Sequence, residues 1–129
     1  MQKITPVVIG LLKQDDRFLI AKRPEHVLMS NYWEFPGGKI EDHETQFDAL
    51  IRELQEEVAV KIIHADFLAQ FQAVFPDRII QLNLWQIKKH LHTPKGNEGQ
   101  EIRWVKAVEF IDYEFLPSNK ELLAFVMGM

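Results

Sequence analysis

The pattern of apolar and polar residues predicts a series of β-strands along the chain. Short runs rich in Ile, Val, Phe and Leu are separated by polar stretches or by turn sequences with proline and aspartate. The first two runs flank a polar turn and predict a hairpin, and the two longest flank Phe75-Pro76-Asp77-Arg78. We expect strands over residues 7–13, 18–22, 61–75, 79–89 and 102–105, and loops over residues 23–31 and 90–100.

A helical pattern occupies the middle of the chain. Thr45 is followed three residues later by Asp48, a capping box that starts a helix at about Gln46. The helix should end near Val58, with Ala59 at its exit. On a helical wheel its apolar residues cluster on one face, as buried positions should: Phe47, Leu50, Ile51, Leu54 and Val58.

A second and shorter helix is expected over residues 120–127, because Pro117-Ser118-Asn119 provides a start signal before it. Several strands with one helix in the middle and one at the end predict an α/β fold, in which helices cover a mixed sheet. The 129 residues fit one domain over residues 1–129, and no repeat or linker divides them.

The composition excludes several classes of function. A formal net charge of −4 argues against a protein that binds nucleic-acid polymers, which would usually present a basic surface. The absence of cysteine excludes disulfides, thiolate zinc sites and cysteine nucleophiles. No apolar run has the length of a membrane span or the pattern of a signal peptide. We therefore expect a cytoplasmic protein, monomeric and without a membrane partner.

Three carboxylates lie close together on the central helix beside its apolar face. Glu53 and Glu57 are neighbours on the helical wheel, and Glu56 lies about a quarter-turn further round. Like charges at this spacing repel each other, so the cluster calls for a cation, and Mg²⁺ prefers such oxygen ligands together with phosphates. The alternative is a solvated acidic face, which is the usual meaning of a charge cluster.

The same residues form a motif that resembles the signature of the Nudix hydrolases. It consists of Gly38, five residues, Glu44, seven residues, and Arg52-Glu53-Leu54 followed after one residue by Glu56-Glu57. The family pattern next has a glycine, where this chain has Ala59; alanine in a left-handed helix exit costs on the order of 1 kcal/mol. The runs at 33–41 and 52–58 are also similar to the MutT-type branch, the 8-oxo-dGTP diphosphatases.

The resemblance implies a Nudix α/β/α sandwich and a hydrolase that uses Mg²⁺, with Mn²⁺ as a substitute. It assigns metal ligation to Glu53, Glu56 and Glu57, with Glu53 as the first choice for the general base. Glu98 would join the metals or assist the base, or simply lie in solvent. Gly37 and Gly38 would let metal or phosphate approach the backbone, although a tight turn alone would also explain them.

Two further residues of the motif have a supporting role in this interpretation. Arg52 is expected to pair with Glu56, one turn further along the helix, and to orient it. Glu44 either ligates metal or lies near the start of the helix, where its charge suits the helix dipole. The predicted catalytic residues are therefore Glu44, Arg52, Glu53, Glu56, Glu57 and Glu98, and the predicted metal ligands are Gly37, Glu53, Glu56, Glu57 and Glu98.

The residues that select a base are less well defined by the sequence. The amide of Asn119 offers a donor and an acceptor, which suits a purine edge that carries both, but Asn119 is equally a good helix N-cap. Phe35 could stack on a base or fill the core, and Arg23 and Arg78 could contact sugar, phosphate or base. The predicted substrate-binding set is Arg23, Phe35, Gly38, Lys39, Phe75, Arg78 and Asn119.

We expect hydrolysis of a nucleoside triphosphate, with 8-oxo-dGTP converted to the monophosphate and pyrophosphate. Such an enzyme removes oxidised nucleotides from the nucleotide pool and so prevents mutations during DNA replication. The same chemistry on CTP, another dNTP or a nucleotide sugar is the first alternative. A nucleotide-binding sensor without catalysis is the second, although the intact Glu53, Glu56 and Glu57 argue against it.

Overall fold

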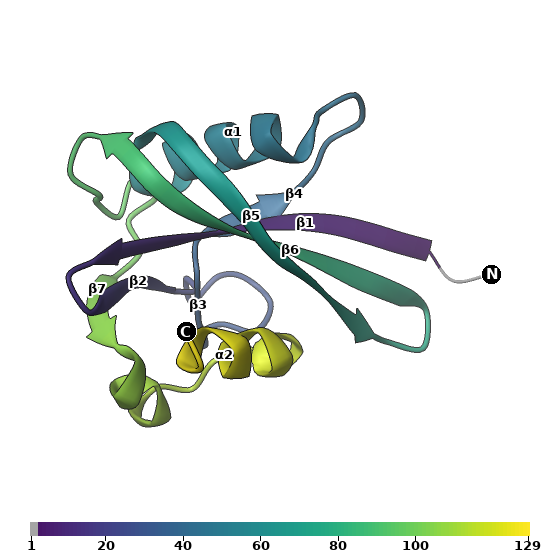
Figure 1. Ribbon diagram of the computed structural model, residues 1–129. Helices are drawn as coiled ribbons and strands as arrows, with labels where there is room; N and C mark the ends of the chain where they lie inside the picture. Colours follow the sequence, from purple (N-terminus) through teal and green to yellow (C-terminus); the bar gives the residue numbers. More distant parts are fainter. Residues whose placement is uncertain (1–2) are drawn as a thin grey trace.

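A mixed sheet lies between two helices in the computed structural model, which describes residues 3–129 (Figure 1). The α/β/α sandwich expected from the sequence is therefore confirmed. The elements, in chain order, are β1 (Lys3–Gln14), β2 (Arg17–Lys22), β3 (Trp33–Glu34), β4 (Gly37–Lys39), α1 (Gln46–Val58), β5 (Lys61–Val74), β6 (Arg78–Leu91), β7 (Ile102–Lys106), the 3-10 helices η1 (Ala107–Asp112) and η2 (Pro117–Asn119), and α2 (Lys120–Met127).

The long strand β1 organises the sheet. The main strand order is β3-β2-β1-β6-β5, with β4 paired to β1 and β7 paired to β2. β1 runs parallel to β6 and antiparallel to β2 and β4, so the sheet is mixed as expected. Because β4 contains both adjacent glycines of the motif, its pairing with β1 fixes where this backbone lies.

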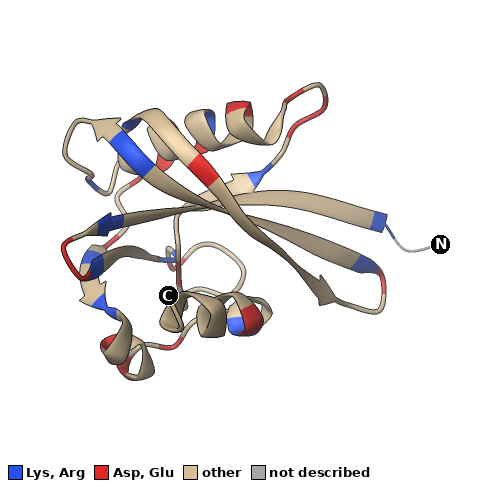
Figure 2. Ribbon diagram, in the orientation of Figure 1, with Lys and Arg blue, Asp and Glu red and all other residues tan. Residues whose placement is uncertain are grey.

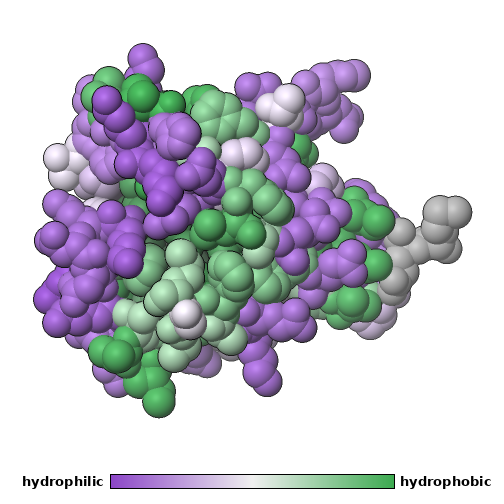
Figure 3. Space-filling view, in the orientation of Figure 1, coloured by the Kyte–Doolittle hydropathy of each residue, from purple (hydrophilic) through white to green (hydrophobic). Residues whose placement is uncertain are grey.

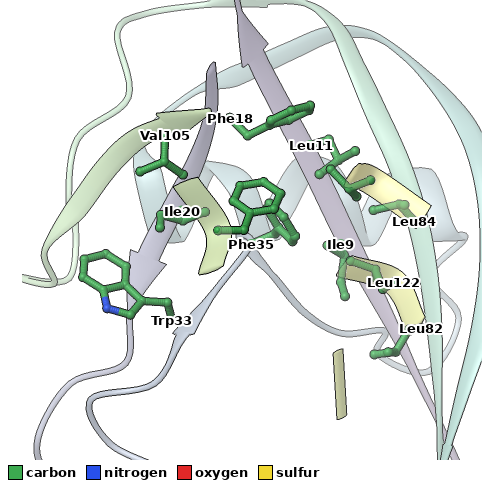
Figure 4. Packing of buried hydrophobic residues seen from close by; sticks show 12 residues of the cluster. Ile9, Leu11, Phe18, Ile20, Trp33, Phe35, Leu82, Leu84, Val105 and Leu122 are labelled. Carbon is green, nitrogen blue, oxygen red and sulfur yellow. The ribbon is translucent and has the colours of Figure 1, made fainter. Parts of the chain in front are cut away.

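The core forms two apolar layers, one on each face of the sheet. Successive strand residues point to opposite faces, so Val8 and Leu12 of β1 pack against α1 whereas Ile9 and Leu11 pack on the side of α2 (Figure 4). The predicted apolar face of α1 is confirmed. Leu50, Leu54 and Val58 are fully buried, and Phe47 and Ile51 pack at the edge of their layer.

The strand β5 forms one edge of the sheet and leaves apolar side chains in solvent. Figure 3 shows apolar residues gathered in the middle of this face, over β5 and α2. The ring of Phe71 in β5 lies 5.6 Å from that of Phe125 in α2, which packs the last helix onto this edge. Among residues 3–129, no helix has the length and apolarity of a membrane span.

Several boundaries differ from those expected. β6 continues to Leu91, so His90 lies in a strand and not in a loop, because it pairs with Ile62 of β5. β1 begins at Lys3 and not at Val7, since its first residues pair with β6. The helix η1 was not predicted; it has no apolar periodicity long enough to detect in the sequence.

Both ends of α1 follow the sequence signals. The N–H of Asp48 donates to the Thr45 hydroxyl at 3.0 Å, and the Asp48 carboxylate accepts from the Thr45 N–H at 3.5 Å, which confirms the capping box. Ala59 closes the helix with φ 60° and ψ 33°, and its N–H donates to the Gln55 carbonyl at 3.2 Å. Alanine therefore occupies the left-handed position at which the family pattern has glycine.

Replacing Ala59 with glycine should raise the free energy of unfolding by about 1 kcal/mol. Left-handed backbone costs a residue with a Cβ roughly 1–2 kcal/mol, and glycine pays little of this cost. Urea unfolding followed by circular dichroism would measure the change. Ala49→Gly is the matched control, because the same substitution inside α1 should lower stability by about 1 kcal/mol or more. A loss of stability in both variants would contradict the interpretation.

Candidate functional site

Two adjoining hollows contain most of the predicted site residues. The first, of about 320 Å³, contains Glu53, Glu57 and Glu98 and is called the carboxylate hollow. The second, of about 210 Å³, contains Phe35 and Asn119 and is called the apolar hollow. Arg23, Glu34 and Gly37 line both hollows, so the two are continuous.

Glu53 lies directly against the backbone of β4. A Cβ at position 38 would overlap the Glu53 carboxylate, so only glycine leaves room for it. Burial raises the pKa of Glu53, the Arg52 guanidinium opposes this effect, and the charges of neighbouring carboxylates add to it. The glycine of the motif is therefore explained by the close approach of the Glu53 carboxylate.

Glu57 is the most perturbed acid of the site. Burial, followed by the charge of nearby Glu34, raises its pKa to about 8, and Glu53 and Glu98 contribute in the same direction. The N–H of Gly37 donates to Glu57 Oε2 at 3.1 Å and partly offsets the increase. A carboxylate that is both buried and surrounded by like charges is strongly stabilised by any cation that enters the hollow.

Arg52 ties the central helix to the segment before it. Its Nε and Nη2 donate to the two oxygens of Glu44, both at 2.8 Å, and its Nη1 donates to Glu53 Oε1 at 2.9 Å. The expected contact with Glu56 is present but longer, at 3.5 Å. The bond from Arg52 lowers the pKa of Glu44 to about 2, so Glu44 is an ionised partner of Arg52. Arg52 thus orients Glu53 and Glu44 more closely than Glu56.

The loop before β7 positions Glu98 beside the end of α1. The N–H groups of Lys95 and Asn97 donate to the carbonyls of Val58 at 3.0 Å and Glu57 at 3.1 Å. The Gln100 amide donates to the Glu57 carbonyl at 2.7 Å and accepts from the Glu98 N–H at 2.9 Å. These bonds use carbonyls that a helix end leaves without partners, and they hold Glu98 at the carboxylate hollow.

The donor set of the carboxylate hollow fits a hard divalent cation. Within residues 3–129, no three His, Asp or Glu side chains already lie close enough together to hold a metal ion. The carboxylates of Glu53, Glu57 and Glu98 nevertheless line one hollow, and the charge of Glu98 raises the pKa of both Glu53 and Glu57, an effect that a cation would reverse. Glu56 lies outside the hollow lining, with its side chain 56% exposed and in contact with Arg52.

The apolar hollow places an amide among hydrophobic side chains. Asn119 is 4% exposed, and its side chain makes no capping bond to α2, so the N-cap alternative lacks its hydrogen bond. The Ser118 hydroxyl lies 3.4 Å from Asn119 Oδ1. Phe35 is buried in the core against Phe110 and Phe115, and it also lines the hollow. Asn119 and Phe35 are therefore brought together from distant parts of the chain.

The remaining predicted residues lie around these hollows. Gly38 and Lys39 line the apolar hollow. Arg23 donates to Glu34 at 3.2 Å and to the Leu28 carbonyl at 2.8 Å, which holds the loop after β2. Phe75 and Arg78 lie at the turn between β5 and β6, with the guanidinium 5.0 Å from the ring centre, and line neither hollow.

Two residues of the site were missed in the sequence. Glu34 lines both hollows, and burial raises its pKa although Arg23 lies beside it. An acidic residue between Trp33 and Phe35, in a strand that should be buried, was the available signal. Gln100 fixes the Glu98 loop, and nothing in its sequence context distinguishes it from an exposed loop residue.

Comparisons with known proteins place this site in a family. The model of the NUDIX domain matches residues 7–125. A CTP pyrophosphohydrolase of Escherichia coli is 32% identical over 127 residues, covering 98% of this chain and 94% of that protein. An 8-oxo-dGTP diphosphatase of Escherichia coli is 35% identical over 119 residues, covering 92% of each.

Solved structures agree with this assignment. The solution structure of the E. coli ORF135 protein has a TM-score of 0.86 and 32% identity, covering 98% of this chain and 91% of that one. A MutT structure from a study of Aliivibrio salmonicida and Vibrio cholerae has a TM-score of 0.84 and 29% identity, covering 98% of each chain. The chain therefore belongs to the NUDIX domain family and is a Nudix hydrolase.

Proposed function

We propose that this hydrolase converts 8-oxo-dGTP to 8-oxo-dGMP and pyrophosphate with Mg²⁺, and so removes an oxidised nucleotide before DNA synthesis. The observation that carries the proposal is the buried amide of Asn119 in a hollow continuous with the carboxylates of Glu53 and Glu57. A nucleoside in the apolar hollow would extend its phosphates toward the carboxylate hollow. The cytoplasmic location and the monomeric state stay predictions.

The carboxylate hollow supplies the groups that hydrolysis of a phosphoanhydride needs. Water attacks one phosphorus, the P–O bond between the α- and β-phosphates breaks, and the proton of the water passes to a base. Glu53 is the proposed base, because Arg52 fixes its orientation and β4 fixes its position. Glu53, Glu57 and Glu98 would hold Mg²⁺, with Glu56 at their edge, and a metal held there would neutralise phosphate charge and lower the pKa of the attacking water.

Asn119 supplies a means of selecting the oxidised base. Guanine has an acceptor at N7, whereas 8-oxo-guanine has a proton there, so its edge combines a donor with the O6 acceptor. The Asn119 amide matches this edge with one acceptor and one donor. With ordinary guanine the amide oxygen would face another acceptor in a buried hollow, which is how hydrogen-bonding sites reach large discrimination.

CTP is the second candidate substrate. The relative named CTP pyrophosphohydrolase covers 98% of this chain. The pairing edge of cytosine also combines an acceptor with an amino donor, so the Asn119 amide could bind it. A nucleotide-binding sensor would need neither a base nor the buried Glu57.

A hydrolysis panel tests the proposed function directly. The protein is incubated with Mg²⁺ and with 8-oxo-dGTP, dGTP or CTP, and the products are separated. We expect 8-oxo-dGTP to be hydrolysed with the highest kcat/KM and to yield pyrophosphate. Glu53→Gln should lower kcat at least about 10²-fold while thermal unfolding is unchanged, because the proposed base is lost. Preferred hydrolysis of CTP would favour the second candidate, and nucleotide binding without turnover would favour the sensor.

The two adjacent glycines should respond differently to alanine. Gly38→Ala should lower hydrolysis by roughly 10²-fold with little change in stability, because the new Cβ displaces only the flexible end of Glu53. Gly37→Ala would instead meet the backbone of Val8 and Ile9, and should lower the free energy of unfolding by about 1–3 kcal/mol. Activity assays and urea unfolding of both variants separate the two effects. Equal losses of stability would refute the close approach of Glu53.

Asn119→Ala should reduce base selectivity more than it reduces metal-dependent hydrolysis. Losing two hydrogen bonds to the base should lower the ratio of kcat/KM for 8-oxo-dGTP over dGTP by roughly 10- to 100-fold. Thermal unfolding is the control, because a capping role would appear there as a loss of stability. An unchanged ratio would remove Asn119 from base selection.

A further inference from the structure

A third hollow, of about 440 Å³, continues from the apolar hollow at the start of β1 and β6. Its charged lining consists of Lys3, Lys39, Arg78 and Asp77, and we call it the cationic hollow. Figure 2 shows these basic positions at the start of β1, the end of β4 and the start of β6. Lys39 and Arg78 belong to the predicted substrate-binding set, but the proposed chemistry uses neither the hollow nor Lys3.

The three hollows lie in series. Val7, Lys39 and Ile80 line both the apolar and the cationic hollow. Arg23, Glu34 and Gly37 line both the apolar and the carboxylate hollow. The apolar hollow is therefore flanked by carboxylates on one side and by cations on the other.

The basic groups of the cationic hollow repel each other. Lys3 and Arg78 are direct partners in the register of β1 and β6, and like charges that face each other across neighbouring strands are destabilising. Lys39 joins them from β4, where it pairs with Val7. The arrangement concentrates positive charge in a protein whose formal net charge is −4.

Little negative charge within the protein offsets this concentration. Within residues 3–129, neither Lys3 nor Lys39 has an ion-pair partner. Arg78 contacts Asp77 at 3.5 Å, but the Asp77 side chain is 74% exposed and the Arg78 side chain 42% exposed, so this pair is weak. Lysine and arginine offer only hydrogen-bond donors, and the Thr5 hydroxyl at the same hollow can add another. An anion with several acceptor oxygens would satisfy all of these groups.

We propose that the cationic hollow is a subsite for a phosphate group on the far side of the nucleoside from the reacting polyphosphate. The orientation of the nucleoside rests on the proposed function, whereas the inference that the hollow binds phosphate rests on the residues of the hollow alone. The ligand is either a nucleotide with a second phosphate on its sugar or a free phosphate anion such as pyrophosphate. Charge-assisted bonds to phosphate oxygens supply the binding.

The test measures binding without metal, so it is independent of hydrolysis. Guanosine 3′,5′-bisphosphate, guanosine 5′-monophosphate and inorganic pyrophosphate are titrated at low ionic strength with a chelator, and the backbone amides of Thr5 and Ile80 are followed by NMR. The wild-type protein should bind the bisphosphate about tenfold more tightly than the monophosphate, which corresponds to about 1.4 kcal/mol. The amide shifts of Thr5 and Ile80 should saturate in the same titration.

Two substitutions, one that removes a positive charge and one that removes a negative charge, separate an effect of charge on binding from an effect of structure. Lys3→Gln should reduce the advantage of the bisphosphate several-fold, and Asp77→Asn, which removes the carboxylate of the hollow, should increase it. Lys120→Gln is the matched control, because it removes another exposed lysine, on α2, and it should change nothing.

The outcomes are distinct. In one outcome, pyrophosphate gives saturating shifts at Thr5 and Ile80, Lys3→Gln weakens this binding, and the bisphosphate binds no more tightly than the monophosphate. This outcome would support the phosphate subsite and assign it to free anions. Equal binding of both nucleotides, with pyrophosphate shifts spread over all basic residues, would overturn the proposal. A failed hydrolysis panel would not affect either result, because no turnover is measured.

Discussion

The burial of the Glu57 carboxyl among other carboxylates is the constraint on which the site depends. Without a bound cation, its pKa of about 8 keeps the Glu57 carboxyl mostly protonated in the folded protein at neutral pH, whereas it ionises in the unfolded chain. As pH rises between the ordinary carboxyl pKa and about 8, the unfolded state loses this proton first and stability falls. A divalent cation removes this penalty because it favours the ionised form. The affinity for a metal and the loss of folding stability without one therefore have the same physical origin, the burial of the Glu57 carboxyl.

The rest of the architecture keeps these carboxylates in place despite their repulsion. The Gly37 N–H holds Glu57, and Arg52 holds Glu53 while its other nitrogens hold Glu44. The Glu98 loop is fastened to the carbonyls at the end of α1, so its position follows from the helix. The carboxylates of Glu53 and Glu57 are thus each oriented by a hydrogen-bond donor, and the hollow remains open to a ligand. The apolar face of α1 packs against Val8 and Leu12 of β1, which fixes the helix that carries Glu53 and Glu57.

Local sequence signals predicted the parts of the site that are local in the chain. The capping box and the apolar face of α1 involve residues within a few turns of each other, and both are confirmed. The register of β6 depends on pairing with β1 and β5, so its extension to Leu91 was not accessible from its own residues. The same reason applies to Glu34 and Gln100, whose roles arise from residues distant in the chain: Glu34 pairs with Arg23 and lies near Glu57, and Gln100 bonds to Glu57 and to the Glu98 loop. Asn119 was a candidate from its chemistry, but its burial beside Phe35 depends on how α2 packs.

The separation of the hollows suggests how one fold can serve several nucleotides. The carboxylate hollow is built from α1 and its flanking backbone, which the family motif specifies. The apolar hollow is built from β1, β3, β4, β6 and η2, and its residues Phe35, Leu82 and Asn119 do not line the carboxylate hollow. The cationic hollow lies further away and shares only Val7, Lys39 and Ile80 with its neighbour. The carboxylate hollow is acidic and the cationic hollow is basic. A ligand with phosphates in both hollows would therefore need a metal only in the carboxylate hollow.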